Sequence, residues 1–214
     1  MQHFVSIIFM VIYMNTLFNN IDEKEKEKIL KTLEIKPIRY SKNEIIITDN
    51  DYSIGVLLKG EAYVEKYDYD GNRSILEQLF ENSLFSKRFY QLRKDISIVS
   101  TTECEVLLLD YDSIMNKIKN KVFINNFLSL YYQKIIDKNI RLEILSKRTI
   151  RDKLLSYFLL LAKDSPKQII NLPFTYTDLA DYLFVDRSAM MREIKKMKDS
   201  GIIKTKGRLI KLLD

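Results

Sequence analysis

The pattern of apolar and polar positions divides the chain into stretches with different periods. From Ile38 to Asp112, short β-branched or aromatic runs alternate at a period of two and are separated by turn-forming pairs such as Asp70-Gly71. The runs are EIIIT, SIGVLL, AYVEKY, SILEQLF, ISIVS and EVLLLD. Six or more short strands at this spacing predict a small antiparallel barrel or sandwich.

Local signals mark three further features around these strands. Residues 67–73 contain Asp-Gly, which tolerates the positive φ angles of a tight turn, so they are the best hairpin candidate. Residues 81–93 interrupt the strands and predict a short helix and a loop. Residues 20–33 predict a short helix with Asp22 as its N-cap and acidic residues in its first turn.

Residues 113–145 contain no Pro or Gly and predict a long helix. Apolar residues recur at heptad spacing, with Lys138 in the one missing slot, and a second apolar stripe recurs every four residues. The heptad seam consists of Ile124, Leu128, Tyr131, Ile135, Leu142 and Leu145, and the second stripe of Ile136, Ile140 and Ile144. Such a helix can be buried in one core, or it can pack on its own domain with one stripe and on a second copy with the other. Its length and its seam favour a dimerisation helix.

Residues 177–198 predict two helices joined by a tight connection at 184–186. The apolar face of the first helix consists of Leu179, Ala180 and Leu183, and that of the second of Met190, Ile194 and Met197. The small Ala180 allows a close helix crossing, Asp186 can N-cap the second helix, and Gly201 suits its C-terminal end. This is the layout of a helix-turn-helix, whose second helix enters the major groove of DNA.

The residues left facing outwards suit contact with DNA. On the second helix they are Arg187, Ser188, Met191, Arg192 and Lys195. An arginine guanidinium can donate two hydrogen bonds to guanine and also binds phosphate, and a serine hydroxyl can donate or accept. Residues 202–212 predict a basic hairpin, or wing. We expect phosphate contacts from Lys195, Lys204, Lys206 and Arg208.

The charge distribution supports this division of the chain. The 214 residues carry a net charge of +6, but residues 146–214 hold 15 Lys and Arg against 8 Asp and Glu, a net +7 that leaves −1 for the rest. Such asymmetry indicates a basic module that meets a polyanion, attached to a neutral module. We therefore divide the chain into four segments: an apolar extension (1–14), the strand-rich domain (15–112), the long helix (113–145) and the basic C-terminal domain (146–214).

The scarcest residues exclude several classes of chemistry. The chain has one Cys, Cys104, and one His, His3, so a Cys/His zinc site, a disulfide framework or a Cys-ligated iron–sulfur cluster cannot be assembled. A hydrolase triad would have to use His3, at the N-terminus. We expect no metal, no cofactor and no enzymatic activity. Cys104 lies in an apolar strand, which favours a buried small hydrophobe over a redox switch.

The apolar stretch from Phe4 to Met14 is too short to span a bilayer and lacks the features of a signal peptide. It is an interfacial anchor, a buried helix, or translated sequence upstream of the true start at Met14. The last two readings are favoured, so residues 1–14 carry no functional assignment and no membrane partner is expected.

Several segments resemble the Crp/Fnr family of bacterial transcription regulators. The segment LPFTYTDLADYLFVDRSAMMREIKKMKDSGIIKTKGRLIKLL, preceded by EILSKRTIRDKLLSYF, is similar to the family's winged helix-turn-helix and the helix leading into it. SIGVLLKGEAYVEKYDYDGNRSILEQL and TECEVLLLDYDSI are similar to its cyclic-nucleotide-binding-type β-roll. The resemblance covers about residues 15–214. It implies a homodimer joined by the long helix, reading two-fold-related half-sites about one helical turn (~34 Å) apart.

By position, the resemblance implies that Arg187, Ser188 and Arg192 read bases. Many members of the family have an acid where Ser188 stands. It also points to an effector pocket in the β-roll, where cyclic-AMP-binding relatives place Gly-Glu and later Arg followed by Ser or Thr. The corresponding residues of this chain are Ser86, Lys87, Lys94 and Asp95. Asp95 would repel a cyclic phosphate, so cyclic-nucleotide binding is not expected.

The charge run around this pocket has two readings. Lys87, Arg88, Arg93 and Lys94 could hold another anion, or the run is a solvated face. Within the family that the chain resembles, the single Cys excludes the iron–sulfur sensors, and the lack of an internal His disfavours the haem sensors.

These observations combine into one hypothesis. The chain is an α+β protein with an N-terminal antiparallel, jelly-roll-like β-roll, a long dimerisation helix and a C-terminal winged helix-turn-helix. It is expected to be a cytoplasmic, sequence-specific transcription regulator that binds a palindromic operator in double-stranded DNA as a homodimer. We expect control by a non-cAMP effector of unknown identity and, in an activator, contact with RNA polymerase. The alternative is a small-molecule sensor module that acts through protein partners without DNA binding.

Overall fold

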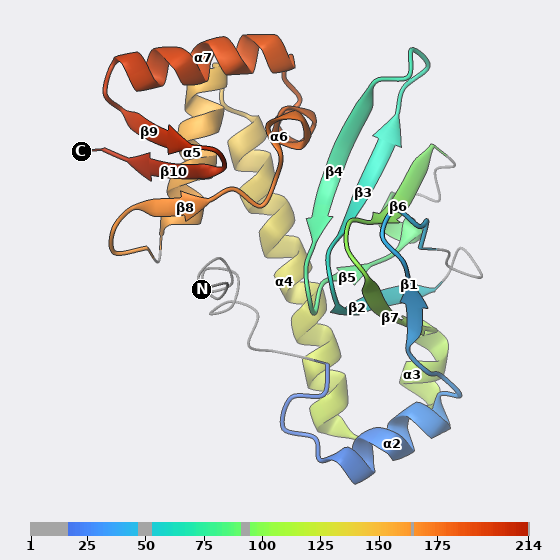
Figure 1. Ribbon diagram of the computed structural model, residues 1–214. Coiled ribbons are helices and arrows are strands. Elements are labelled where there is room, and N and C mark those ends of the chain that lie inside the picture. Colours follow the sequence, from blue (N-terminus) through green and yellow to red (C-terminus); the bar gives the residue numbers. More distant parts are fainter. Residues whose placement is uncertain (1–16, 47–52, 91–94, 164, 214) are drawn as a thin grey trace. The chain divides into compact units, whose positions relative to one another are not determined.

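The computed structural model describes residues 17–46, 53–90, 95–163 and 165–213 (Figure 1). They form two compact units, and the boundary between the units falls at Ile135–Ile136, within the long helix α4 (Lys121–Leu145). The apolar segment at 1–14 lies outside the described residues. Each unit is therefore described by itself.

The first unit contains an antiparallel β-roll built from two sheets. One sheet has the strand order β1-β7-β2-β5 and the other the order β4-β3-β6, and all strand pairs are antiparallel. The strands are β1 (Ile38–Tyr40), β2 (Ile54–Lys59), β3 (Ala62–Tyr67), β4 (Arg73–Leu79), β5 (Leu84–Phe85), β6 (Ile96–Ser100) and β7 (Cys104–Leu109). Five of the six expected runs are confirmed as strands; of EIIIT, Ile45 forms an isolated bridge to Val99, and its last two residues lie outside the description.

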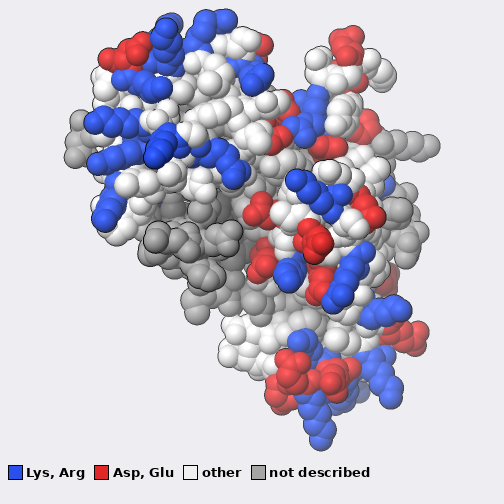
Figure 2. Space-filling model, viewed as in Figure 1, with Lys and Arg blue, Asp and Glu red and all other residues white. Residues whose placement is uncertain are grey.

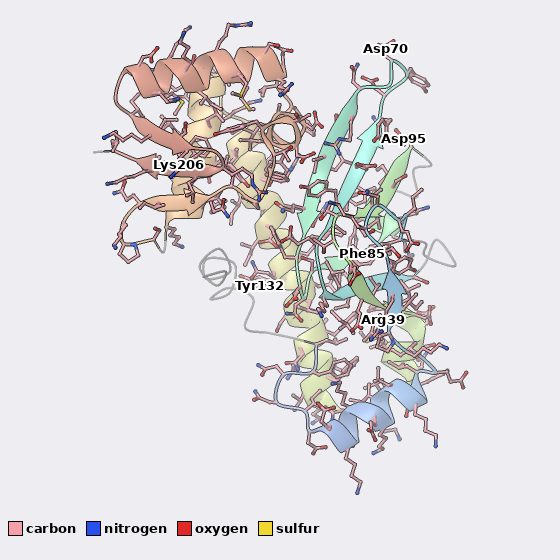
Figure 3. The ribbon with its side chains drawn as sticks, viewed as in Figure 1. Arg39, Asp70, Phe85, Asp95, Tyr132 and Lys206 are labelled. Atoms are coloured by element: carbon pink, nitrogen blue, oxygen red, sulfur yellow. The ribbon has the colours of Figure 1, made fainter. Side chains whose placement is uncertain are left out.

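Side chains from both sheets form one buried cluster between them. Phe85 is fully buried there, and a Cβ on Gly55 would lie 2.1 Å from its ring, so this packing requires glycine (Figure 3). Cys104 belongs to the same cluster, and burial raises the pKa of its thiol. The expectation that Cys104 is a small buried hydrophobe is confirmed.

The turn between β3 and β4 has the expected hairpin geometry. Gly71 has φ +81°, and the Asp68 carboxylate accepts hydrogen bonds from the backbone N–H of Asp70 (2.9 Å) and Asn72 (2.8 Å). The Asn72 side chain also donates to Asp68 (3.0 Å). These hydrogen bonds, led by that of the Asn72 side chain, lower the pKa of Asp68.

The segment at 81–93 contains both a strand and a short helix. The 3-10 helix η1 (Lys87–Tyr90) confirms the expected helical turn, whereas the two-residue strand β5 was not expected. Residues 91–93 lie outside the described residues. The helix expected at 20–33 is confirmed as α2 (Glu23–Thr32), with the Asp22 carboxylate accepting from the Glu25 N–H at 2.8 Å.

The expectation of one uninterrupted helix over 113–145 is wrong. The chain instead forms α3 (Tyr111–Lys117) and then α4. Ile118 has extended backbone angles, and the Asn120 side chain accepts a hydrogen bond from the Phe123 N–H at 3.0 Å. Asn120 thus caps a new helix, because an asparagine side chain satisfies an amide that has no partner within the helix.

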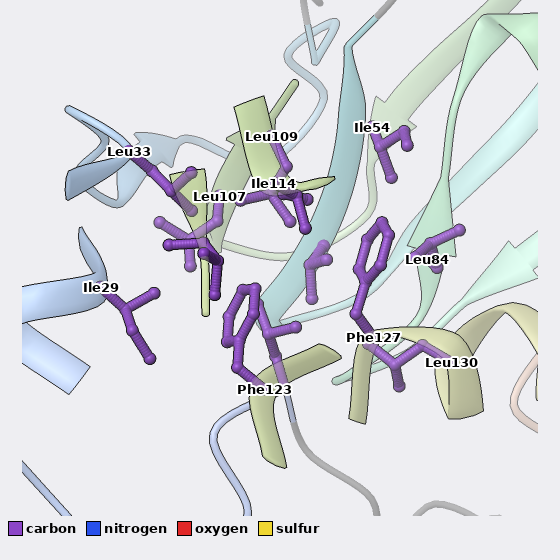
Figure 4. Close-up of a cluster of buried hydrophobic side chains, with 13 residues drawn as sticks. Ile29, Leu33, Ile54, Leu84, Leu107, Leu109, Ile114, Phe123, Phe127 and Leu130 are labelled. Atoms are coloured by element: carbon purple, nitrogen blue, oxygen red, sulfur yellow. The ribbon is translucent and has the colours of Figure 1, made fainter. Parts of the chain in front are cut away.

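A second buried cluster fills the space between the first sheet and the three helices of this unit (Figure 4). It is formed by residues of α2, β2, β5, β7, α3 and α4 together with Leu17, Leu33 and Ile118. Phe123, Phe127 and Leu130 supply the buried face of α4. Ile124 and Tyr131 pack against the same cluster, so the first half of α4 is part of the β-roll core.

A buried ion pair also fixes α4 to the β-roll. The Lys134 ammonium is paired with the Glu77 carboxylate of β4, and Glu77 accepts a second hydrogen bond from the Tyr90 hydroxyl at 2.5 Å. The Lys134 side chain is 7% exposed and that of Glu77 15%. The Lys134 ammonium also lies 5.4 Å from the ring centroid of Phe89, in η1. The pair therefore connects α4, β4 and η1.

In the part of the second unit that the structure describes, the end of α4 is combined with three helices and a small sheet. Its elements are α5 (Ile150–Ala162), β8 (Ile169–Asn171), α6 (Tyr176–Leu183), α7 (Arg187–Asp199), β9 (Ile203–Lys206) and β10 (Leu209–Leu212). The antiparallel sheet has the order β8-β10-β9. The expected hairpin at 202–212 is confirmed, and β8 adds a third strand that was not expected. None of the described helices has both the length and the apolar character needed to cross a membrane.

We expect Lys134→Met to destabilise the β-roll by about 3 kcal/mol or more, because it leaves the Glu77 carboxylate buried without its cation. Replacing both partners, in Lys134→Met/Glu77→Gln, should recover most of this loss, since the amide still accepts from Tyr90. Urea unfolding measures both effects. Lys66→Met is the matched control, because the Lys66–Asp95 pair is about one-third exposed and should contribute under ~1 kcal/mol. Equal losses in the two single variants would contradict this account.

Candidate nucleic-acid interface

Helices α6 and α7 are held together by the apolar faces expected from the sequence. Leu179, Ala180 and Leu183 of α6 and Met190, Ile194 and Met197 of α7 are all buried. Ala180 is 1% exposed, which agrees with its expected place at a close crossing. The connection between the two helices spans residues 184–186, as predicted. The helix-turn-helix is therefore confirmed as a packed structural unit.

The opposite face of α7 carries polar and basic side chains. Arg187, Ser188, Met191, Arg192 and Lys195 are all exposed, as expected. Ser188, Arg192 and Lys195 follow one another at spacings of four and three residues, so they form one row along the helix. The buried apolar face thus directs this row towards solvent.

Both helices of the motif begin with a capping side chain. The Asp186 carboxylate accepts from the Ala189 N–H at 2.7 Å, which confirms it as the N-cap of α7. At the start of α6, the Thr175 hydroxyl accepts from the Asp178 N–H at 3.1 Å. Because these caps satisfy amides of the first turn, they fix where each helix starts. The start of α7 is the part that would meet base edges in the major groove.

An ion pair fixes α7 to α5. The Arg151 guanidinium lies 2.6 Å from the Glu193 carboxylate, which is 17% exposed, and Lys196 lies 3.9 Å from the other oxygen of Glu193. The acidic side chain in the middle of α7 is thereby neutralised on the side away from the exposed row. This contact was not predicted, because the sequence does not show that Arg151 reaches α7.

The wing presents further basic side chains. Lys204 and Lys206 of β9 and Arg208 in the turn before β10 are exposed, as expected, and Lys211 of β10 is exposed as well. Lysine and arginine side chains gather over α7 and the β8–β10 sheet (Figure 2), and Figure 3 marks the place of Lys206. The exposed row of α7 and the wing are therefore two basic parts of one unit.

A hydrogen bond joins the wing to α6. The Tyr176 hydroxyl donates to the Gly207 carbonyl at 3.0 Å, and partial burial raises the pKa of Tyr176. This contact orients the turn that carries Arg208.

The predicted dimer seam does not lie on one exposed face. Ile124 and Tyr131 pack against the β-roll core, and Leu145 is half-buried. Leu128, Ile135 and Leu142 are 50%, 57% and 66% exposed. Tyr132, 68% exposed, lies four residues after Leu128 and three before Ile135 (Figure 3). We call Leu128, Tyr132, Ile135 and Leu142 the exposed strip of α4.

The four residues of the candidate effector pocket have different surroundings. Ser86 is fully buried, and its hydroxyl donates to the Ser53 carbonyl (2.9 Å) and accepts from the Arg88 N–H (3.2 Å). Lys87 is half-buried. Asp95 forms an ion pair with Lys66 at 3.5 Å. Lys94 lies outside the described residues.

These contacts show that the β-roll itself uses two of the four pocket residues, Ser86 and Asp95.

The neighbouring Lys134–Glu77 pair was not predicted from the sequence, because a lysine in a charged helix gives no sign of burial. Among the residues that the structure describes, no group of three or more His, Cys, Asp or Glu side chains is arranged to hold a metal ion.

Comparisons with known proteins divide the chain in the same way as the structure. A family model described as the cyclic nucleotide-binding domain matches residues 37–121, and one described as the Crp-like helix-turn-helix domain matches residues 152–214. Together they cover about two thirds of the chain. No curated protein matches it.

Solved structures with the same fold match nearly the whole chain at low identity. A double mutant of CooA from Carboxydothermus hydrogenoformans is 19% identical, with a TM-score of 0.76, covering 93% of this chain and 92% of that one. CLP from Xanthomonas campestris, described as a c-di-GMP-responsive global regulator, is 14% identical, with a TM-score of 0.67 and coverages of 90% and 100%. A cyclic nucleotide-binding domain containing protein from Listeria monocytogenes is 18% identical, with a TM-score of 0.69 and coverages of 87% and 96%.

We expect Asp186→Ala to lower the free energy of unfolding of the second unit by about 1 kcal/mol, because it removes the N-cap of α7. Asp186→Asn retains an oxygen that can accept from the Ala189 N–H and should lose much less. Thermal unfolding of the two variants beside the unchanged protein measures the difference. If Asp186→Asn lost as much as Asp186→Ala, the carboxylate would act through its charge rather than as a cap.

Proposed function

The chain belongs to the Crp/Fnr family of DNA-binding transcription regulators, and from this premise we propose that it reads a two-fold-related operator through the exposed face of α7. Arg187, Ser188 and Arg192 contact bases in the major groove. One observation supports this assignment: the polar and basic residues of α7 lie on one exposed face. The Asp186 cap fixes the start of the helix, and its opposite, apolar face is buried. A helix held in this way can discriminate between bases, because a bidentate arginine contact is lost when its backbone is misplaced.

Phosphate contacts hold the recognition helix in its groove. Lys195 on α7 and Lys204, Lys206 and Arg208 on the wing supply them. All four side chains are exposed, so they can exchange their solvent counterions for phosphates. Such contacts position the protein on the duplex without reading its sequence.

The protein binds DNA as a homodimer through the exposed strip of α4. Leu128, Tyr132, Ile135 and Leu142 follow one another at spacings of four, three and seven residues, which is the heptad pattern of paired helices. A row of large apolar side chains that are half or more exposed indicates a protein interface. Two copies joined in this way present two recognition helices to two half-sites about one helical turn (~34 Å) apart.

Regulation does not use cyclic AMP. Ser86-Lys87 stands where cyclic-AMP-binding relatives have Gly-Glu, and the Ser86 hydroxyl bonds to the Ser53 carbonyl. The half-buried Lys87 is left to receive a different, anionic effector. The regulator acts in the cytoplasm, where its DNA lies, and as an activator it would contact RNA polymerase.

Substitutions should separate base reading from phosphate binding on a duplex selected from random DNA. Arg187→Ala and Arg192→Ala should each weaken binding to that duplex by ~1–3 kcal/mol per half-site and relax its sequence preference, because they remove base contacts. Lys204→Ala and Lys206→Ala should weaken binding to all sequences and reduce the slope of log K against log salt by about 2 each, because the dimer loses one phosphate contact at each half-site. Fluorescence anisotropy at several salt concentrations measures both effects.

The control for these variants is Lys24→Ala, which removes an exposed lysine from α2 in the other unit. Its affinity and salt slope should match those of the unchanged protein. Failure of the unchanged protein to bind any duplex at low salt would contradict the proposed function.

The dimer assignment is tested by Ile135→Asp. A charge in the middle of the exposed strip should give a monomer at micromolar concentration, because the carboxylate would be buried against the partner helix. Val122→Asp is the matched control, since Val122 is 41% exposed on α4 but lies off the strip. Sedimentation measures the mass of each variant. An unchanged protein that is itself monomeric at this concentration would refute the assignment.

A further inference from the structure

The C-terminal end of α6 is stabilised by cations from two other helices. The last turn of α6 contains no basic residue of its own. Instead, Arg141 of α4 donates to the Tyr182 carbonyl at 3.0 Å, and Lys153 of α5 donates to the Leu183 carbonyl at 3.2 Å. Cations at this end of a helix satisfy its free carbonyls and its partial negative charge. The end of α6 therefore depends on side chains from α4 and α5.

The next residue, Phe184, has a backbone conformation that disfavours large side chains. Its φ and ψ are +54° and +53°, the left-handed region in which glycine is preferred. This conformation lets the chain leave α6 and reach Asp186, the N-cap of α7, within two residues. A strained backbone of this kind persists only where its surroundings hold it in place.

Arg141 also contacts the side chains that flank this turn. Its guanidinium lies 3.9 Å from the ring centroid of Tyr182 and 5.2 Å from that of Phe184. Tyr182 in turn packs against Phe174, with ring centroids 4.8 Å apart, inside the second unit. A planar guanidinium stacks on aromatic rings while it donates hydrogen bonds, which a lysine ammonium does less well. One side chain thus contacts both the backbone and the rings of the turn.

Arg141 also lies next to the proposed dimer contact. It directly precedes Leu142 of the exposed strip, on the part of α4 that belongs to the second unit. Any shift of this end of α4 would therefore move the guanidinium that touches the α6–α7 turn.

We infer that Arg141 is a positioning residue for DNA recognition: it holds Tyr182 and Phe184 and so sets the start of α7. The contacts of the guanidinium offset the energetic cost of the left-handed conformation of Phe184. The turn then places Asp186, Arg187 and Ser188. This inference rests on the proposed function, because it concerns the same base-reading residues. Arg141 itself is not required to touch DNA.

The experiment measures affinity for a duplex selected from random DNA and for an unrelated duplex. The affinity of Arg141→Met for the selected duplex should be about tenfold lower than that of the unchanged protein. This is the size expected when a charge-assisted hydrogen bond is removed. Its affinity for the unrelated duplex should fall no further than that of Arg148→Met. Arg148→Met removes an exposed arginine before α5 and is the matched control for charge.

A second substitution provides the decisive comparison. Phe184→Gly removes the strain of the left-handed turn, so the turn no longer needs the guanidinium. In the Phe184→Gly background, Arg141→Met should cost less than about threefold on the selected duplex, against about tenfold in the unchanged protein. If Arg141→Met fails to fold, Arg141→Lys replaces it in the same cycle, since lysine keeps the charge but loses the planar stack.

Each outcome decides between the two claims. An unchanged protein that binds no DNA refutes the proposed function, and the inference with it. An unchanged protein that binds, beside an Arg141→Met variant that matches Arg148→Met on both duplexes, refutes the inference alone. A tenfold loss that persists in the Phe184→Gly background also refutes it, because the loss would then not depend on the left-handed turn at Phe184.

Discussion

The structure depends on one constraint: a single continuous helix, α4, has to satisfy three different surroundings, two of them at different points along its length and one on its remaining face. Its first half packs Phe123 and Phe127 into the β-roll core and buries Lys134 against Glu77. Its last turns, in the second unit, bring Arg141 to the end of α6. The remaining face carries the exposed strip. Because an α-helix has 3.6 residues per turn, the residues of the exposed strip alternate along the sequence with those that pack inwards. A substitution in one set therefore affects its neighbours in the other.

Positive charge serves two purposes in the second unit. Some cations face outwards, such as Arg192 on α7 and Lys206 on the wing. Others are used within the fold: Arg151 neutralises Glu193, and Lys153 donates to a carbonyl of α6. The net charge of the C-terminal segment therefore overstates what is available to a polyanion. The internal cations instead help to hold α6 and α7 in place.

The sequence was sufficient where a feature depends on local rules. Strand periodicity, the Asp-Gly hairpin, the Asp186 cap and the two faces of α7 all followed from residues close together in the chain. The α3–α4 break was also local, but its signal, Asn120, was hidden in a run without Pro or Gly. The exposed strip was shifted from the predicted seam because heptad spacing does not tell which side of the helix the β-roll core covers; Phe123 and Phe127 enter that core and bring Ile124 and Tyr131 with them. The Lys134–Glu77 and Arg151–Glu193 pairs join residues far apart in sequence, and no periodicity reveals such pairs.

The burial of Cys104 has a practical consequence. It is the chain's single cysteine, it lies in the β-roll core, and burial raises the pKa of its thiol. Thiol reagents attack the thiolate, so this side chain is protected at neutral pH. A cysteine introduced at an exposed position would then be the one reactive thiol in the molecule. The natural sequence is thus suited to site-specific fluorescent or spin labelling without removal of a native residue.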